Sequence, residues 1–371
     1  MHNEFLISAL SMKKSWQQLL RTYLQSQWLR CGLLAWLFLP LSAVMYLITA
    51  TRRLLYRLKI LKSYRPPLPV IVVGNIFIGG TGKTPLTIAL VQALRQHGWH
   101  IGVISRGYGV DIGEQARTAY GPSAKASEVG DEPSLIAAYV PVSVHPNRRL
   151  AIEKLLENYP LTRLIIADDG LQHLALERDL EIVVQDNRRV GNGLLLPAGP
   201  LREPAQRLKS VDYVVTNLKE RPSSPTQQQA KNKPSTSTSK ASSHVNMWLA
   251  ISEIEQLSTG ISLSVSDFLQ QYYDSRIYAI AGIGQPERFF TSLREHGILP
   301  DQCQGFADHH VYSTHDLHAF HDGIVLMTSK DASKCRDIMS SNHWVVHVQA
   351  EFSDPHFFQS IDEKLRQLPL Y

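Results

Sequence analysis

The sequence predicts an α/β protein: a parallel sheet with helices, like that of the P-loop NTPases, and a phosphate-binding loop at one end of the sheet. Apolar, β-branched runs alternate with stretches of helical periodicity from about residue 70 onward. A glycine-rich turn joins the first of these strands to a helix. Polar clusters directly follow several strands, and parallel sheets bind their ligands at the carboxyl ends of strands.

The glycine-rich turn predicts nucleotide binding. The buried strand Val70–Val73 leads into Gly-Gly-Thr-Gly-Lys-Thr, and a helical pattern begins near Lys83. In this arrangement backbone N–H groups and the helix N-terminus surround phosphate oxygens. Lys83 is expected to reach the β- and γ-phosphates of ATP, and the hydroxyl of Thr84 to hold Mg²⁺. The expected contacts are Phe77, Ile78, Gly79, Gly80, Thr81, Gly82, Lys83 and Thr84.

The match to the phosphate-loop pattern has one departure. Phe77 stands where the first glycine is expected, and Gly79 and Gly80 supply the flexibility instead. A plain glycine turn with a solvated lysine is the simpler alternative, but it does not explain why both flanking elements fit.

Composition narrows the function classes. The 371 residues are enough for two domains, and the net charge of +5 is too small to indicate nucleic-acid binding. The three cysteines, Cys31, Cys303 and Cys335, lie far apart and match no zinc or disulfide spacing, which favours reduced thiols in the cytosol.

The N-terminal 65 residues predict a membrane-associated helical segment. Residues 1–30 suggest an amphipathic surface helix, and residues 31–50 are uncharged and long enough to span about 30 Å as a helix. A kink or re-entrant turn at Pro40 and a buried globular helix are the alternatives. The basic residues that follow, from Arg52 to Arg65, indicate the cytoplasmic side of the membrane.

The rest of the chain divides into three parts. Residues 66–218 are expected to form the nucleotide-binding domain, with helices near 86–97, 134–139 and 149–158 and strands near 101–105, 142–145, 164–167, 182–184 and 213–216. Residues 219–244 are almost free of apolar side chains and predict a linker or insertion. Residues 245–371 predict a smaller α/β domain, with strands near 277–281, 324–327 and 344–348.

Two acidic pairs are candidates for the chemistry. Asp168 and Asp169 end an apolar strand, where a P-loop enzyme holds Mg²⁺; a simple Asp-Asp-Gly turn is the alternative. Asp131 and Glu132 precede a helix and either interact with its dipole or serve as general base and metal-binding acid.

The remaining polar clusters are less specific. Arg106 follows a strand, and Arg202 and Glu203 lie in a proline-rich loop; each arginine either binds a phosphate or is an ordinary surface group. The histidines after Asp308 fit no zinc spacing. One of them orienting a catalytic carboxylate is the better interpretation, and it requires the second domain to fold over the first.

Several motifs in order resemble the tetraacyldisaccharide 4′-kinase family of lipid A biosynthesis. Together they cover most of residues 70–335. The motifs are Val73-Gly-Asn-Ile-Phe-Ile-Gly-Gly-Thr-Gly-Lys-Thr-Pro85, Ser105-Arg-Gly-Tyr-Gly109, Gly130-Asp-Glu-Pro133, Asp168-Asp-Gly-Leu-Gln-His173, Gly191-Asn-Gly193, Leu196-Pro-Ala-Gly-Pro-Leu-Arg-Glu203, Ala281-Gly-Ile-Gly284 with Arg288-Phe-Phe290, and Ala307-Asp-His309.

The resemblance implies a lipid kinase. It would transfer the γ-phosphate of ATP to the 4′-hydroxyl of tetraacyldisaccharide 1-phosphate at the cytoplasmic face of an inner membrane. It implies a glycolipid substrate and a lipid surface as partners, with no nucleic acid and no obligatory protein partner.

The resemblance also implies roles for residues. Asp131 is implied as the base and His309 as its orienting partner, with Lys83 on the ATP. Glu132, Asp168 and Asp169 are implied as metal-binding or nearby acids. Candidates for phosphate or substrate contacts are Arg106, Arg148, Arg149, Arg202 and Glu203.

The sequence departs from the family at two places. The family's Thr-Glu-Lys-Asp-Ala reads Thr328-Ser-Lys-Asp-Ala332 here, so a carboxylate is absent at Ser329, and the stretch 219–244 is long for the family. Two rival functions remain at this point: a membrane-docked NTPase switch that acts on a protein partner, and a non-enzymatic membrane adaptor. The adaptor leaves Lys83 and the acidic pairs unexplained.

Overall fold

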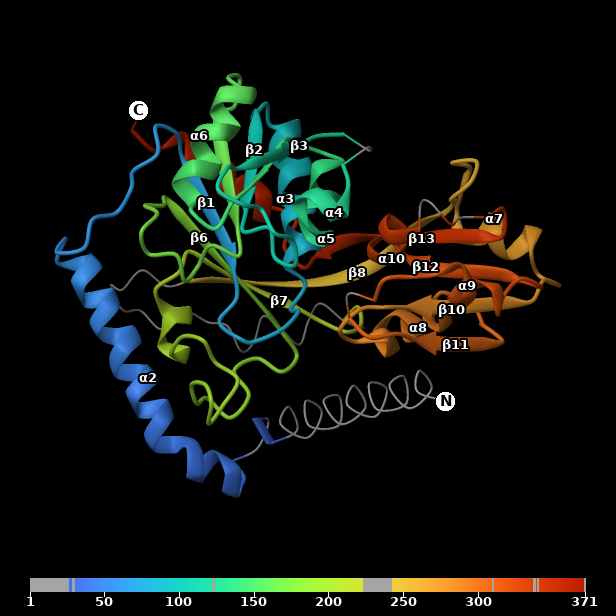
Figure 1. The fold of residues 1–371 in the computed structure, drawn as a ribbon, viewed down its shortest axis with the longest axis horizontal. Coiled ribbons are helices and arrows are strands. Elements are labelled where there is room, and N and C mark those ends of the chain that lie inside the picture. Colours follow the sequence, from blue (N-terminus) through green and yellow to red (C-terminus); the bar gives the residue numbers. More distant parts are fainter. Residues whose placement is uncertain are drawn as a thin grey trace, which may run out of the picture.

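The computed structural model describes residues 27–28, 31–121, 124–222, 242–308, 310–335, 338 and 340–369. Within them, thirteen strands form one continuous, mostly parallel sheet with helices, which confirms the predicted fold class. The strand order is β11-β10-β12-β13-β8-β7-β6-β1-β5-β2-β4-β3, with β9 paired to β8. Figure 1 shows two lobes along this sheet and a long helix, α2, at one side.

The first lobe is built around strands that are buried along their whole length. Val, Ile and Leu fill both faces of β1 and β5, as expected for parallel strands covered by helices. β3 closes the edge in antiparallel pairing with β4. The strands are β1 (Val70–Gly74), β2 (Ile101–Ser105), β3 (Arg117–Ala119), β4 (Val142–Val144), β5 (Leu164–Asp168), β6 (Leu180–Asp186) and β7 (Tyr213–Asn217).

Helices cover the two faces of this part of the sheet and form its cores. Leu86, Leu90 and Leu94 of α3 recur at helical spacing and are fully buried against β1 and its neighbours. The helices are α3 (Lys83–Gln96), α4 (Ala126–Val129), α5 (Asp131–Ala137) and α6 (Arg148–Asn158), followed by a 3₁₀ turn at Ala205–Lys209.

The second lobe is a smaller α/β unit with its own buried clusters around Phe290, Leu326 and Met327. Its elements are β8 (Ser243–Gln256), β9 (Ser262–Leu263), α7 (Val265–Gln271), β10 (Ile277–Ala281), α8 (Pro286–Glu295), β11 (Gln302–Gly305), α9 (Thr314–His318), β12 (Ile324–Thr328), α10 (Ser329–Cys335) and β13 (His343–Phe352). A last helix, α11 (Phe357–Arg366), follows β13.

Two long strands and the last helix tie the lobes together. β8 pairs in parallel with β7 at its start and antiparallel with β13 along its length. The helix α11 then returns to the first lobe, where Phe357, Ile361 and Leu365 join its core beside α3. The first lobe therefore contains the C-terminal helix as well as the phosphate loop.

The helix α2 (Leu33–Arg57) extends along the outside of the first lobe (Figure 1). By length and composition it can cross a membrane, and only 11% of its most apolar 18-residue window is buried. Leu33, Trp36 and Leu37 are 67–89% exposed. Ala35 and Ser42 are the buried residues of this helix, and Ser42 Oγ donates to the Leu195 carbonyl oxygen at 2.7 Å. The expected surface helix of residues 1–30 lies mostly outside the described residues.

Candidate active site

The phosphate loop leaves β1 and enters α3 at the expected residues. Gly82 occupies the N-cap of α3 with φ 95°, a left-handed conformation that favours glycine. A side chain there would also collide with the side chain of Asn217, the last residue of β7. The sequence places glycine here because both the backbone conformation and the space require it.

Phe77 is part of the wall of the loop. It is 3% exposed and pairs with Leu201 in an antiparallel bridge, while the Ile78 amide donates to the Pro200 carbonyl oxygen at 2.9 Å. The guanidinium of Arg188 lies 4.3 Å from the centre of its ring. The first half of the loop is therefore fixed by the chain around residue 200, and Gly79 and Gly80 have open space beside them for a ligand.

Two asparagines that the sequence analysis did not single out hold the centre of the loop. Asn75 Nδ2 donates to the Gly79 carbonyl oxygen at 3.0 Å and to Thr81 Oγ1 at 3.1 Å. Asn217 Nδ2 donates to the Thr81 carbonyl oxygen at 3.1 Å. Each asparagine stands at the end of a strand, and that placement was the only sequence signal available.

Arg188 is a third residue that was missed. Its Nη2 and Nε donate to Asp186 Oδ2 at 2.6 and 2.9 Å, Nε also reaches Asp186 Oδ1 at 3.1 Å, and Nη2 donates to the Gly80 carbonyl oxygen at 3.1 Å. This planar fork fixes the guanidinium against both the loop and the Phe77 ring.

The two strand-end carboxylates differ in environment. Lys83 Nζ lies 3.3 Å from Asp169 Oδ1, and Arg202 Nη1 lies 3.4 Å from Asp169 Oδ2. Burial opposes ionisation of Asp169, but these two cations outweigh it and hold its pKa below the usual range. Asp169 is therefore ionised at neutral pH and pairs with Lys83 at the phosphate loop.

Asp168 is 2% exposed, and its Oδ1 is buried without a hydrogen-bond partner among the described residues. Burial, and then the negative charge of Glu132, raise the pKa of this carboxyl to about 7. Its Oδ2 is 3.4 Å from Ser105 Oγ. An unsatisfied carboxylate oxygen of this kind fits a cation.

The oxygen-bearing side chains at this strand end fit Mg²⁺. Carboxylate and hydroxyl oxygens are the ligands that Mg²⁺ prefers, and Asp168 offers an unpaired one beside Lys83 and the start of α3. Among the described residues no group of three or more His, Cys, Asp or Glu side chains has metal-site geometry. Mg²⁺ commonly uses only one or two carboxylates, with water and substrate phosphates as its other ligands.

Asp131 begins α5, directly after Gly130, whose φ of 99° turns the chain into the helix. Across the lobes, Lys334 Nζ of α10 lies 3.2 Å from Asp131 Oδ2. The second lobe thus meets the first at this carboxylate. His309, the expected orienting partner, lies outside the described residues.

The predicted arginines take different positions. Arg148 is buried behind Asp168 and donates to its backbone carbonyl oxygen at 3.1 Å. Arg149 lies on the outer surface of α6, paired with Glu153 at 2.7 Å, and so is not gathered with Lys83. Arg106 is exposed after β2, and Arg202 reaches Asp169.

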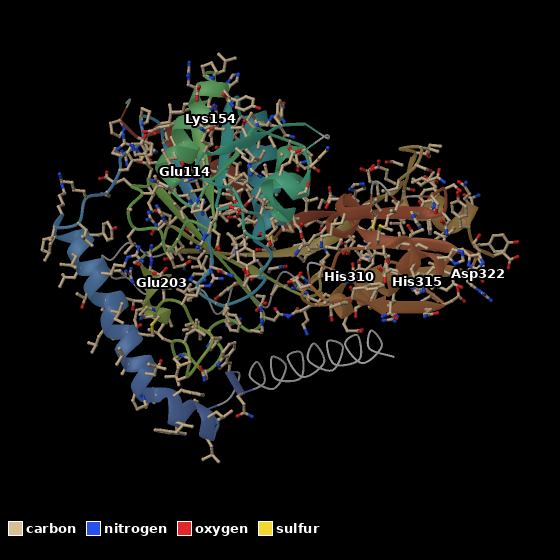
Figure 2. The ribbon with its side chains drawn as sticks, viewed as in Figure 1. Glu114, Lys154, Glu203, His310, His315 and Asp322 are labelled. Carbon is tan, nitrogen blue, oxygen red and sulfur yellow. The ribbon has the colours of Figure 1, made fainter. Side chains whose placement is uncertain are left out.

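Glu203 lies between α2 and the sheet (Figure 2). It accepts from Gln172 Nε2 at 3.0 Å and lies 3.8 Å from Arg53 of α2 and 3.3 Å from Arg207. The labelled histidines His310 and His315 lie in the second lobe instead (Figure 2). Glu203 therefore connects the membrane-type helix to the loop that carries Arg202.

A cavity of about 580 Å³ lies between the C-terminal half of α2 and the chain after β5. Leu54 and Leu176 give it apolar walls, and its charged lining is mixed, with Arg53, Arg57 and Arg178 beside Glu177 and Glu181. Arg178 is held by three backbone carbonyl oxygens, those of Leu171, His173 and Leu176.

Comparisons with known proteins place the chain in a family. The sequence profile of the LpxK family, described as tetraacyldisaccharide-1-P 4′-kinase, matches residues 34–366. A tetraacyldisaccharide 4′-kinase of Bordetella petrii is 44% identical over 348 residues, which cover 93% of this chain and 96% of that protein. One from Shewanella baltica is 44% identical over 345 residues, covering 92% and 94%.

A solved structure has the same fold. The crystal structure of LpxK from Aquifex aeolicus in complex with ATP is 25% identical, with a TM-score of 0.73, and the match covers 90% of this chain and all of that one. The match to the family covers residues 34–366, which include both lobes and all but the first residue of α2. The chain belongs to the tetraacyldisaccharide 4′-kinase family.

Proposed function

We propose that this kinase transfers the γ-phosphoryl group of ATP to the 4′-hydroxyl of tetraacyldisaccharide 1-phosphate, giving the 1,4′-bisphosphate. The family supplies the reaction, and the phosphate loop with Lys83 held by Asp169 at 3.3 Å is the observation that carries it here. The comparisons favour this function over a membrane-docked NTPase switch, because the relatives are named for the kinase.

The residues divide into three groups. The N–H groups of Gly79 to Gly82 and the ammonium of Lys83 would bind the phosphates of ATP, and Arg188 and the two asparagines keep the loop in shape. Thr84 and Asp168 would hold Mg²⁺, which neutralises charge on the phosphates when bound, and Asp169 and Glu132 would be the acids near it. Asp131 would accept the proton of the 4′-hydroxyl.

The acceptor would approach from the side of α2. We place the protein at the cytoplasmic face of the inner membrane, with the exposed apolar side chains of α2 in the lipid. ATP is available on that face, and Arg52, Arg53 and Arg57 at the end of α2 suit anionic lipid head groups. The cavity beside Arg53 and Leu54 would admit part of the glycolipid.

Phosphate transfer from γ-labelled ATP to tetraacyldisaccharide 1-phosphate in mixed micelles tests the proposal. We expect labelled lipid with the wild-type protein and none with Lys83→Ala, because the loop loses the cation that neutralises the transferred group. Asp131→Asn is expected to lower kcat by about 10²–10⁴-fold, the usual loss for a general base. Release of free phosphate without labelled lipid would contradict the kinase and support the NTPase switch.

A further inference from the structure

Lys334 is a buried cation that no part of the reaction described above uses. It lies on α10 of the second lobe, and α10 packs against α5 of the first lobe, which Asp131 begins. The Lys334 side chain is 9% exposed, and its Nζ lies 3.2 Å from Asp131 Oδ2. Among the described residues of α10, Lys334 alone makes an ion pair with the first lobe.

The ammonium of Lys334 is incompletely satisfied. It carries three N–H donors, yet among the described residues Nζ has no partner in hydrogen-bond geometry and only the ion pair with Asp131. A buried donor without an acceptor costs free energy, and buried charges even more. If this contact served only to join the lobes, acceptors for the other N–H groups of Lys334 would be expected within the protein.

The position of the Lys334 N–H groups beside Asp131 indicates which group accepts their hydrogen bonds. A hydroxyl that gives its proton to Asp131 must come within about 2.6–3.2 Å of that carboxylate, and it attacks the phosphorus along the line of the leaving oxygen. An ammonium 3.2 Å from the same carboxylate is then close to the non-bridging oxygens of the phosphoryl group in transfer. Lys83 approaches the phosphates from α3, so the two cations come from different lobes.

We propose that Lys334 is a catalytic residue that donates hydrogen bonds to the phosphoryl group as it is transferred. The proposal depends on the proposed function, because it needs Asp131 at the acceptor hydroxyl. In the step, the bond from the acceptor oxygen to phosphorus forms, the bond from phosphorus to the ADP oxygen breaks, and the proton moves to Asp131. Lys334 keeps its proton throughout and stabilises negative charge on the equatorial oxygens.

The first test is Lys334→Met, which keeps most of the length of the side chain and removes the charge. We expect kcat to fall by about 10²-fold, the scale of losing one donor to developing charge, with the KM for ATP changed less than about threefold. Lys334→Arg should recover part of kcat. Lys364→Met is the matched control, because Lys364 also pairs with an aspartate, Asp212, but far from the phosphate loop.

The second test separates contact with the phosphoryl group from an effect through the base. In an Asp131→Asn background, Lys334→Met should still lower the residual kcat, by a factor that differs from the one in the wild type because the two residues are in contact. No further loss in that background, or an unchanged kcat in the single variant, would overturn the proposal. If Lys334→Met does not melt cooperatively, Lys334→Gln takes its place with the same expectations.

The same assay keeps the two proposals apart. Wild-type protein that labels the lipid while Lys334→Met does so at the wild-type rate refutes only the role of Lys334. Wild-type protein that labels no lipid refutes the proposed function itself.

Discussion

At the scale of single residues, Asp168 carries a cost in stability that its proposed role in binding Mg²⁺ would explain. Its carboxyl is buried behind the phosphate loop, and burial together with the charge of Glu132 raises its pKa to about 7, so that in the absence of nucleotide about half of the folded molecules carry a proton there at neutral pH. The unfolded chain releases that proton near pH 4. A bound cation would favour the ionised form instead, so the site is destabilised until it is occupied.

This cost predicts how stability depends on pH. Because the folded pKa is raised, the contribution of Asp168 is fully present below about pH 4 and is lost as the pH rises to about 7. We expect Asp168→Asn, measured without nucleotide, to gain Tm relative to the wild type as the pH rises through this window. Thermal melts of both proteins between pH 4 and 8 test this.

Asp169→Asn is the internal control for that experiment. The pKa of Asp169 is held low by Lys83 and Arg202, so its contribution is present above the unfolded pKa and is lost as the pH falls. The asparagine variant at 169 should therefore be less stable than the wild type at neutral pH. Identical pH profiles for Asp168→Asn and the wild type would show that Asp168 is ionised in the empty site.

The sequence predicted the residues whose chemistry follows from a short motif. Lys83, Asp168 and Asp169 come together as expected because a strand–loop–helix unit and a neighbouring strand end fix their places. Asn217, Arg188 and Lys334 could not be predicted in the same way. They reach the site from strands and helices that are distant in sequence, and only the order of the strands in the sheet brings them there.

At the scale of elements, the buried strands were predicted well and the half-exposed ones poorly. A continuous apolar run such as Leu164–Ala167 indicates a strand covered on both faces. β8 was missed because its 14 residues mix buried and exposed positions without strict alternation, and it begins at Ser243, inside the predicted linker. α5 begins at Asp131, earlier than expected, because Pro133 fits the first helical turn.

The exposed face of α2 carries a prediction of its own. A charge at the centre of a bilayer costs about 2.5–3.5 kcal/mol, so Leu37→Glu together with Leu47→Glu should weaken membrane binding by at least tenfold. Both leucines are more than 60% exposed, and the fold of the first lobe should not change. Flotation of the full-length protein with vesicles that contain anionic lipid measures the effect.

Leu161→Glu is the matched control for α2, because Leu161 is 68% exposed on the body of the first lobe. It should float like the wild type. Equal flotation of the α2 double variant and the wild type would show that this helix does not carry membrane binding.

At the scale of the whole molecule, the chain closes on itself through its last helix. Phe357 is 1% exposed in the first core, with its ring centre 5.4 Å from that of Tyr213 and 5.3 Å from that of Phe352. In the sequence, the entire second lobe lies between the strands of the first lobe and this helix, and β8 and β13 join the two lobes. Periodicity in the sequence gives no sign of this return, because it reports which face of a helix is apolar and not what covers that face.

Because the two lobes share one sheet and α11 packs in the first lobe, we expect the lobes to unfold together. Phe357→Ala removes a buried aromatic side chain from the first core and Phe268→Ala removes one from the second, each at a cost of about 3–5 kcal/mol. Each variant should lower one common transition in urea and reduce the hydrogen-exchange protection of β1 and β10 alike. Loss of protection in β10 alone after Phe268→Ala would show that the second lobe opens independently, and the contact between Lys334 and Asp131 would then have to form again each time that lobe closes.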